Sequence, residues 1–597
     1  MYILGISYGF VATAVLLKDG KVIACASEER FNGIKNYNGF PQKSISYCLS
    51  EAGIKGEDLD LVTTPYTNLP PSHFSLDNKK STQAENLLSR LFGFGMTLRK
   101  FFRIVRYYFP NIFRPLGQVS YRFAVKLLTI YYAQIQKKQI ANYLKISVDK
   151  IVSFDHHISH AAAGYYSSSY NQSKALVLTL DGEGDGNCAT VSVFEGAKHR
   201  MLSNTPREYS IGYIYGYVTK FLGMKPHEHE YKVMGLAPYA KEGEVDKVYS
   251  KITDFISLDR NDPLKFVTKK NSQDFDMFLK KEFLDTRFDN LAGAFQRLVE
   301  ENTKKWIEKA QEKTKIKTVI LSGGVFMNIK VNQVVASLPK VKRLFIMPSC
   351  ADETGAIGSS YLGYLMLSKK GKKAIRIEPI SHLYWGPSFS DSEIFGELKP
   401  LKSKVSFKKV KDVEKVIAKL LSEGKIVANL SGRMEFGARA LGNRSILANP
   451  TKYETVKIIN EQIKSRDFWM PFAPTILKER QKDYIVNPKN IDSPYMMLGF
   501  NTTKLAQEEI KAALHPSDST CRPQILDKTI NHRYYRIIKE FENLTGIGAV
   551  LNTSFNIHGF PIVLGPKEAL IAFLNSGLQY LVMENYLITK KHSHAKY

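Results

Sequence analysis

Cysteine is scarce in this sequence, and long apolar runs are missing. The 597 residues include only five cysteines, widely scattered and without a CxxC pair. This pattern argues against a disulfide framework or a thiolate zinc site and is typical of a reducing compartment. No run of about eighteen apolar residues occurs, and Met1 leads directly into a strand-like stretch, so we expect neither a membrane span nor a cleaved signal peptide. These absences favour a cytoplasmic protein.

Acidic residues are missing from one long segment. Between Glu85 and Asp149 there is no Asp or Glu, whereas Lys and Arg alternate with aromatic and aliphatic residues. The region of about 80–147 therefore reads as basic amphipathic helices inserted into a domain. It either packs on that domain or rests on an anionic membrane surface, where it could hold a lipid-linked acceptor. The chain's formal charge of +27 favours anionic partners, but without an RNA-binding motif we do not expect nucleic acid.

Glycine-containing turns follow three strand-like runs along the chain. YILGIS begins at Tyr2, ALVLTL precedes the turn Asp181–Gly186, and TVILS precedes Gly323–Gly324. Turns without side chains let backbone N–H groups approach phosphate oxygens closely. The order of these units resembles the actin, sugar-kinase and Hsp70 superfamily of duplicated ribonuclease-H-like ATPase domains. We expect nucleotide contacts from Asp181, Gly182, Gly184, Gly323, Gly324 and Asn328.

A change of composition divides the chain. At 597 residues two domains are the default, and the basic stretch KKGKKAIRIEPIS looks like a surface connection. Strands and helices alternate again beyond it, as in a separate α/β domain. We therefore predict an α/β protein with domains at 1–375 and 376–597.

Three histidines stand close together in DHHISH. On a helix, His156 and His160 are four residues apart and share a face, which is the geometry for two imidazoles on one divalent metal. His157 points elsewhere. Asp352, in a small-residue turn after the strand RLFIMP, is the candidate carboxylate ligand. This ligand set suits Fe(II), Mn(II) or Zn(II), and the alternative is that the histidines cap or pack the helix.

Two further stretches narrow the resemblance. HEHEYKVMGLAPYA (His227–Ala240) and GRMEFGARALGNRSIL (Gly432–Leu447) are similar to signatures of the NodU/CmcH carbamoyltransferase family. HxxxH in an actin-like domain also looks like the threonylcarbamoyl transferases that modify tRNA. The resemblance implies a metal-dependent transfer domain followed by a YrdC-like domain, which makes carbamoyl adenylate from ATP and carbamoyl phosphate. The acceptor would be a hydroxyl of a small molecule or glycan.

Cationic and amide side chains gather in the second half of the sequence. Guanidinium groups bind phosphate and carbamate oxygens at two points, and an amide or hydroxyl orients a carbamoyl NH2 group. In the first domain, Lys232 is either a charge near the nucleotide or an ion-pair partner of Glu230. We expect binding by Arg433, Arg439, Asn443, Arg444, Lys464, Arg466, Arg522, Asn552, Ser554 and Asn556, with catalytic roles for His157, Lys232, Arg439 and Ser554.

The sequence departs from the family pattern at the first phosphate turn. Where family members usually carry His-Asp, this chain has Phe10 and Val11; Asn36 and Phe560 also replace a usual His and Glu, and Asn449 an Asp. Three interpretations follow: a rebuilt acceptor site, an adenylating enzyme that has lost transfer, or another general base such as His157 or Tyr8. The rival functions are a tRNA threonylcarbamoyl-type enzyme and a transfer-deficient regulator. The acceptor, the metal and the oligomeric state stay open.

Overall fold

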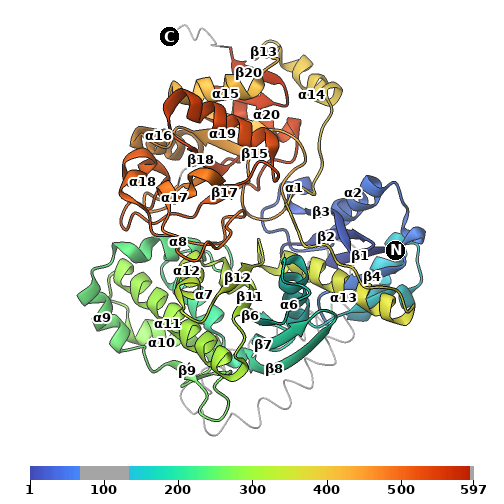
Figure 1. Cartoon of the computed structure of the whole chain (residues 1–597), viewed down its shortest axis with the longest axis vertical. Helices are drawn as coiled ribbons and strands as arrows, with labels where there is room; N and C mark the ends of the chain where they lie inside the picture. The colour runs from blue at the N-terminus through green and yellow to red at the C-terminus, as the bar shows by residue number, and fades with distance from the viewer. Residues whose placement is uncertain (68–132, 465, 592–597) are drawn as a thin grey trace, which may run out of the picture.

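The computed structural model describes residues 1–67, 133–464 and 466–591 (Figure 1). Most of the predicted basic insertion at 80–147 lies outside these residues. In the described ranges, every helix is too short or too polar to cross a bilayer.

Two five-stranded sheets form the first part of the chain, and both have the same topology. In each sheet, three antiparallel strands are followed by two strands that add in parallel beside the first. The order is β3-β2-β1-β4-β5 in one and β8-β7-β6-β11-β12 in the other, so the predicted duplication of a ribonuclease-H-like unit is confirmed. The strands are β1 (Tyr2–Ser7), β2 (Thr13–Lys18), β3 (Lys21–Ser27), β4 (Leu61–Thr64) and β5 (Ile151–Ser153), then β6 (Ala175–Gly184), β7 (Asn187–Glu195), β8 (Lys198–Pro206), β11 (Thr318–Ser322) and β12 (Arg343–Ile346).

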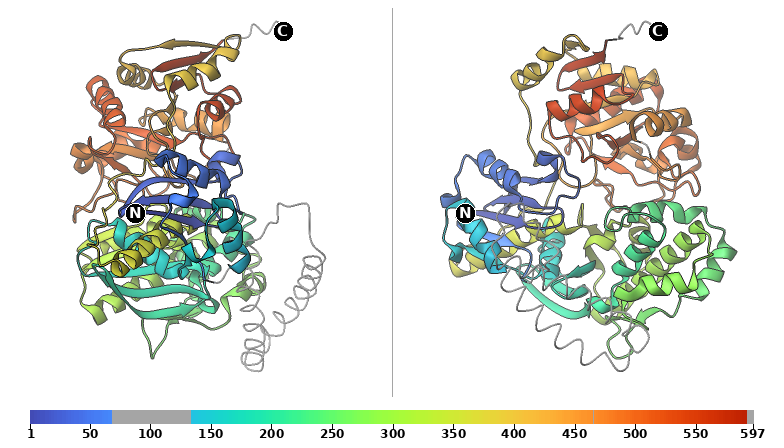
Figure 2. Two further views of the ribbon diagram at one scale, coloured as in Figure 1. Left: turned by 90° about the vertical axis from the view of Figure 1, so that its right-hand side faces the viewer. Right: turned by 180° about the vertical axis from the view of Figure 1, so that it is seen from behind.

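Helices α6 (His156–Ser167) and α13 (Gly355–Lys370) join the two sheets. Helix α13 packs on the first sheet, α6 packs on the second, and the helices pack against each other (Figure 2). They approach so closely that a Cβ atom on Gly358 would lie 1.7 Å from the carbonyl oxygen of Ser159. Only glycine fits this crossing, which brings the start of α6 beside the turn that precedes α13.

Further helices cover the two sheets, and many of them surround the second one (Figure 1). The small two-stranded sheet β9 (Ile256–Leu258) and β10 (Phe266–Thr268) lies among them. The helices are α1 (Glu29–Asn32), α2 (Gln42–Ala52), α7 (Ile211–Phe221), α8 (Glu230–Leu236), α9 (Glu242–Ser250), α10 (Phe275–Glu282), α11 (Phe288–Thr314) and α12 (Ile329–Ser337).

An irregular segment, residues 371–390, leads to an eight-stranded mixed sheet in the remaining chain. Its order is β13-β20-β19-β14-β15-β18-β16-β17, and helices flank it (Figure 1), so the α/β prediction is confirmed here too. The strands are β13 (Val405–Lys409), β14 (Val427–Leu430), β15 (Arg444–Ala448), β16 (Ala473–Leu477), β17 (Gln524–Leu526), β18 (Ala549–Ser554), β19 (Tyr580–Met583) and β20 (Tyr586–Lys590). The helices are α14 (Asp391–Leu398), α15 (Val413–Ser422), α16 (Tyr453–Ile459), α17 (Gln481–Tyr484), α18 (Lys504–Glu509), α19 (His532–Thr545) and α20 (Pro566–Leu574).

Polar contacts fix the two parts of the chain to each other. The Lys489 ammonium donates to the carbonyl oxygens of Ala336 (2.7 Å), Leu338 (2.6 Å) and Val341 (3.0 Å). A cation at a helix C-terminus satisfies carbonyl groups that the helix leaves without partners. Helix α12 of the first part is therefore capped by a residue of the second.

Candidate functional site

The two predicted histidine ligands lie in the first turns of α6. The Asp155 carboxylate accepts a hydrogen bond from the N–H of Ile158 (3.0 Å) and so starts the helix at His156. His160 follows one turn later, and the two imidazole rings have their centroids 4.5 Å apart. The HxxxH spacing therefore places both rings on one side of the helix, as predicted.

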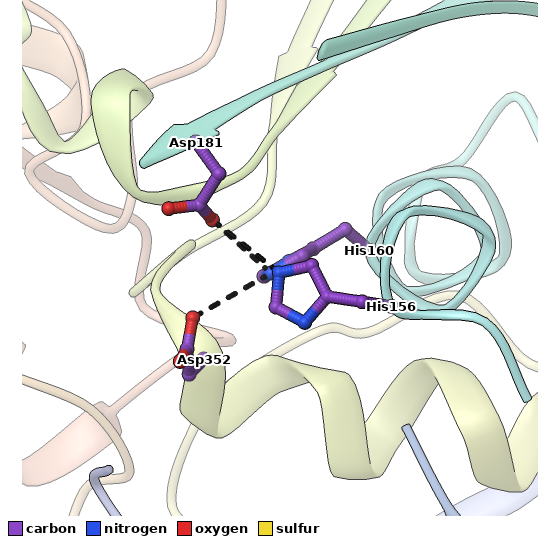
Figure 3. Close-up of side chains that lie close together, drawn as sticks. All are labelled: His156, His160, Asp181 and Asp352. Carbon is purple, nitrogen blue, oxygen red and sulfur yellow. Dashed lines mark ion pairs between the residues drawn. The ribbon is translucent and has the colours of Figure 1, made fainter. Parts of the chain in front are cut away.

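Two carboxylates complete this cluster (Figure 3). Nε2 of His160 lies 3.3 Å from Asp181 and 3.9 Å from Asp352, and Nε2 of His156 lies 3.7 Å from Asp181. One ligand atom from each of the four residues lies within 4.8 Å of all the others. The structure thus brings His156, His160 and Asp352 together as predicted and adds Asp181.

Asp181 belongs to a strand rather than to the predicted glycine turn. Strand β6 continues to Gly184, although its pairing with β7 becomes irregular after Leu180. The N–H groups of Gly182 (2.6 Å) and Gly324 (2.9 Å) donate to the Asp181 carboxylate. These glycines hold a metal-ligand candidate, instead of leaving their N–H groups free for phosphate.

Gly184 has a steric role in the same cluster. A Cβ atom at this position would lie 1.9 Å from the His156 ring. Gly323 has φ of +103°, and a Cβ atom there would lie 2.5 Å from the carbonyl oxygen of Leu180 in β6. The glycines read from the sequence as phosphate contacts are thus explained in the structure by the packing of the histidine–carboxylate cluster.

Burial controls the protonation of the cluster. Burial, together with the neighbouring His160, lowers the pKa of His156 to about 3, so this ring is neutral. Burial alone would lower the pKa of His160, but Asp181 and Asp352 raise it. Burial and repulsion from Asp181 raise the pKa of Asp352 to about 7. Two half-buried carboxylates beside neutral imidazole form an arrangement that a cation would stabilise.

The ring nitrogens of both histidines fit a metal site. Neither nitrogen of His156 or of His160 makes a hydrogen bond, although both rings are buried. Buried polar atoms that make no hydrogen bond are costly unless a ligand satisfies them. Two imidazoles and two carboxylates form a donor set suited to Fe(II), Mn(II) or Zn(II).

Adding a suitable divalent cation is expected to stabilise the protein against heat. A ligand that binds the folded state alone at 100 times its Kd contributes about 2.7 kcal/mol, or a rise of roughly 2–4 °C in Tm for a protein of this size. Differential scanning fluorimetry after chelation, with Fe(II), Mn(II) and Zn(II) added separately, measures this shift. The variant Asp352→Asn should lose most of it; an equal shift in both proteins would place the cation elsewhere.

The two candidates for the general base are both buried. His157 lies behind the cluster, where its Nδ1 is 2.8 Å from the Thr179 hydroxyl, and burial lowers its pKa. The Tyr8 hydroxyl donates to Gln139 (3.1 Å), and burial raises its pKa. Neither residue is among the four that form the cluster, and a base role for either stays a prediction.

Three arginines of the second part form a cluster without acidic partners. Among the described residues, the guanidinium groups of Arg439, Arg466 and Arg522 make no ion pair; Arg466 stacks on Phe472, 5.2 Å from the ring centroid. Burial, then the charge of Arg466, lowers the pKa of Arg439 to about 10. Burial, then Arg439 and Arg466, lowers the pKa of Arg522 well below its usual value. Three half-buried like charges held together form an anion-binding arrangement.

Lys464 and the NTSFN stretch lie together nearby. The buried Lys464 ammonium donates to Asn556 Oδ1 (2.5 Å), to Ser554 Oγ (3.2 Å) and to the carbonyl oxygens of both residues. Burial, then Arg466, lowers its pKa well below the usual value. The Asn552 amide donates to Ala440 O and Thr475 Oγ1, both at 3.1 Å, while its buried Oδ1 makes no hydrogen bond.

Two of the predicted binding arginines, Arg444 and Arg433, use their guanidinium groups in hydrogen bonds to the protein backbone. Arg444 is fully buried and donates to the carbonyl oxygens of Leu564, Ser431, Gly432, Asn443 and Pro387. Arg433 donates to the carbonyl oxygens of Gly386, Ile23 and Trp385 and to the Tyr47 hydroxyl, and it pairs with Glu51 at 3.3 Å. Asn443 donates to Arg433 O (2.8 Å) and accepts from Asn531 (2.8 Å). Arg433, Asn443 and Arg444 therefore hold loops in place, and their hydrogen-bond donors are used within the protein.

Replacing Arg444 by methionine is expected to lower the free energy of unfolding by about 2–4 kcal/mol, because several buried carbonyl groups lose their donor. Urea unfolding followed by circular dichroism measures the loss. Arg536→Met is the control, since the Arg536 side chain is 42% exposed and pairs with Glu414 only at 3.9 Å. Equal stability of the two variants would contradict a structural role for Arg444.

Two predicted residues of the first part also have defined partners. Lys232 forms an ion pair with Asp467 (2.9 Å) across the two parts of the chain, so the suggested pair with Glu230 is wrong; Glu230 accepts from His227 N–H (2.6 Å). Asn328 caps α12 through the N–H groups of Lys330 and Val331, and its amide donates to Gln296 (2.9 Å).

Family models match both parts of the chain. The model described as Carbamoyltransferase N-terminus covers residues 2–361, and the one described as Carbamoyltransferase C-terminus covers residues 418–590. The chain belongs to the carbamoyltransferase family. An uncharacterised protein of Methanocaldococcus jannaschii is 31% identical over 98% of this carbamoyltransferase and 99% of its own length. Nodulation protein NolNO of Sinorhizobium fredii is 29% identical over 97% of this chain and 78% of its own length.

Sequence reasoning missed three residues of this carbamoyltransferase that lie between the metal-ligand cluster and the arginine cluster. Ser349, Glu353 and Arg30 are all buried. Burial raises the pKa of Glu353 to about 7. Glu353 directly follows the ligand candidate Asp352 in the sequence. This adjacency was the one sequence feature that could have pointed to a role for Glu353.

Proposed function

We propose that this carbamoyltransferase forms carbamoyl adenylate from ATP and carbamoyl phosphate and transfers the carbamoyl group to a hydroxyl of a small molecule or glycan. Water first cleaves the phosphate–oxygen bond of carbamoyl phosphate, which leaves carbamate and inorganic phosphate. A carbamate oxygen then attacks the α-phosphorus of ATP, and pyrophosphate leaves. The acceptor hydroxyl attacks the carbamoyl carbon, its proton passes to a base, and AMP leaves with the bonding electrons.

The observation that carries this proposal is the position of the arginine cluster. The loop that carries Arg439 lies on the turn that carries Asp352, because the N–H of Ala438, which precedes Arg439, donates to the hydroxyl of Ser349 (3.0 Å), three residues before Asp352. An adenylate made at the arginines would thus form close to the histidine–carboxylate cluster. A short path matters because a mixed anhydride hydrolyses readily in water.

The arginine cluster and the histidine–carboxylate cluster would have different roles in the reaction. Arg439, Arg466 and Arg522 bind phosphate and carbamate oxygens and stabilise the negative charge that develops on pyrophosphate. Asn552, with a free carbonyl oxygen, accepts a hydrogen bond from the carbamoyl NH2 group. His156, His160, Asp181 and Asp352 would hold a divalent cation, which polarises a phosphate or carbonyl oxygen when bound.

Pyrophosphate exchange tests the first half-reaction. Labelled pyrophosphate should enter ATP only when carbamoyl phosphate is present. Labelled carbamoyl phosphate, offered with aminoglycosides, sugars and other hydroxyl compounds, should yield a carbamoylated product. Exchange that requires threonine and bicarbonate instead would indicate a tRNA threonylcarbamoyl-type enzyme. Exchange without transfer to any acceptor would favour the transfer-deficient interpretation prompted by Phe10 and Val11.

A further inference from the structure

The turn after β12 carries a buried serine in an unusual backbone conformation. Ser349 has φ of +54°, in the left-handed region that residues other than glycine rarely adopt. The residue is 3% exposed. Such a strained backbone persists only where the surroundings impose it. A buried, strained serine three residues before the ligand candidate Asp352 calls for a physical explanation.

The Ser349 hydroxyl makes one hydrogen bond within the first part and one to the second part. It donates to a carboxylate oxygen of Glu353, the neighbour of Asp352. It accepts from the backbone N–H of Ala438 (3.0 Å). Ala438 directly precedes Arg439 of the arginine cluster. A single hydroxyl therefore joins the turn of a metal-ligand candidate to the backbone of a binding arginine.

Close packing supports this hydrogen bond. Gly437 has φ of +94°, and a Cβ atom there would lie 2.5 Å from the Ser349 Cβ. Glycine at this position lets the Arg439 loop lie directly on the serine. Any larger residue would push the loop away from the turn and lengthen the bond to the Ala438 N–H.

A second contact holds the same loop. The buried guanidinium of Arg30, in α1, donates to the carbonyl oxygen of Gly437 (2.6 Å). Its Nε lies 3.5 Å from Glu29. The carbonyl of Gly437 and the N–H of Ala438 belong to the same peptide unit, so both faces of that unit are fixed by the first part of the chain.

We propose that Ser349 is a positioning residue, which holds the peptide before Arg439 so that this arginine reaches the adenylate site. The same contact couples the adenylate site to the turn that carries Asp352. This inference rests on the proposed function. The hydrogen bond between Ser349 and Ala438 would thus align the metal-ligand cluster with the arginine cluster. Without the hydroxyl, the Ala438 N–H loses its partner, and of the two hydrogen bonds to this peptide unit only the one from Arg30 remains.

The test measures carbamoyl-phosphate-dependent pyrophosphate exchange in full-length variants. Ser349→Ala should lower kcat/KM for exchange about tenfold, while metal content stays that of the unchanged protein. Ser349→Gly, which relieves the backbone strain and also removes the hydroxyl, should lose a similar factor. Ser360→Ala is the matched control, because the Ser360 hydroxyl is buried but bonds only to its own helix, at Ile357 O (2.7 Å).

A double-mutant cycle separates positioning from general destabilisation. Arg439→Lys keeps a charge but loses the two-point contact. If Ser349 acts through Arg439, adding Ser349→Ala to Arg439→Lys should cause little further loss of exchange. Equal losses in both backgrounds, or unchanged exchange in Ser349→Ala, would overturn the inference. Absence of exchange in the unmodified enzyme would instead overturn the proposed function, so the two failures are distinguishable.

Discussion

His160→Ala is expected to abolish carbamoyl transfer while leaving pyrophosphate exchange largely intact. Its Nε2 lies 3.3 Å from Asp181 and 3.9 Å from Asp352, so its removal takes away the group that lies between both carboxylates. Loss of a polarising cation is worth several kcal/mol of transition-state stabilisation, or roughly 1,000-fold in rate. Metal content by mass spectrometry and the yield of carbamoylated product measure the two effects.

His199→Ala serves as the control for His160→Ala. His199 lies on β8, outside the metal-ligand cluster, and stacks on Phe194 with 5.2 Å between ring centroids. This variant should keep its metal and its transfer activity. Full transfer by His160→Ala with normal metal content would show that the cluster does not serve the reaction. Equal loss of exchange and transfer would show that the two half-reactions cannot be separated at this residue.

Local sequence patterns predicted the strands and one helix face well. YILGIS and TVILS are strands over the predicted residues, because apolar runs bounded by turn residues have few alternatives. His156 and His160 share a helix face, since helical spacing alone requires it. Asp352 was found because it follows a strand in a turn of small residues. Each of these features depends on neighbours in the chain.

Features that depend on distant residues were not predictable. Asp181 looked like part of a phosphate turn, whereas its carboxylate is held by the N–H of Gly324, 143 residues away in sequence. That contact arises because β6 and β11 pair in parallel. No spacing rule in a single sequence connects the two positions.

The roles of the individual arginines were not predictable from the sequence either. Arg439 and Arg444 lie in one short motif and looked equivalent. Arg444 donates to the carbonyl oxygens of Pro387 and Leu564 and becomes structural, whereas Arg439 is near the charge of Arg466 and forms no ion pair with any residue that the structure describes. Which arginine remains free is decided by loops that other parts of the chain bring to it.

Arg522→Met is expected to reduce carbamoyl-phosphate-dependent exchange by about 10²–10³-fold, which is the usual loss when one donor to developing charge is removed. The same change should raise the free energy of unfolding by about 1 kcal/mol, because a binding-site charge kept at a cost to stability is removed. Burial and the charges of Arg439 and Arg466 already lower the pKa of Arg522 well below its usual value. Exchange kinetics measure the expected loss of activity, and urea unfolding measures the expected gain in stability.

Inorganic phosphate provides the decisive comparison for Arg522→Met. An anion that neutralises the three arginines should stabilise the unmodified protein and stabilise the variant much less, because phosphate binds only the folded state. Arg536→Met, on the surface, should change neither exchange nor the response to phosphate. A loss of stability in Arg522→Met comparable to that of Arg444→Met would instead mean that Arg522 holds the fold, and the second part of the chain would then lack its proposed anion site.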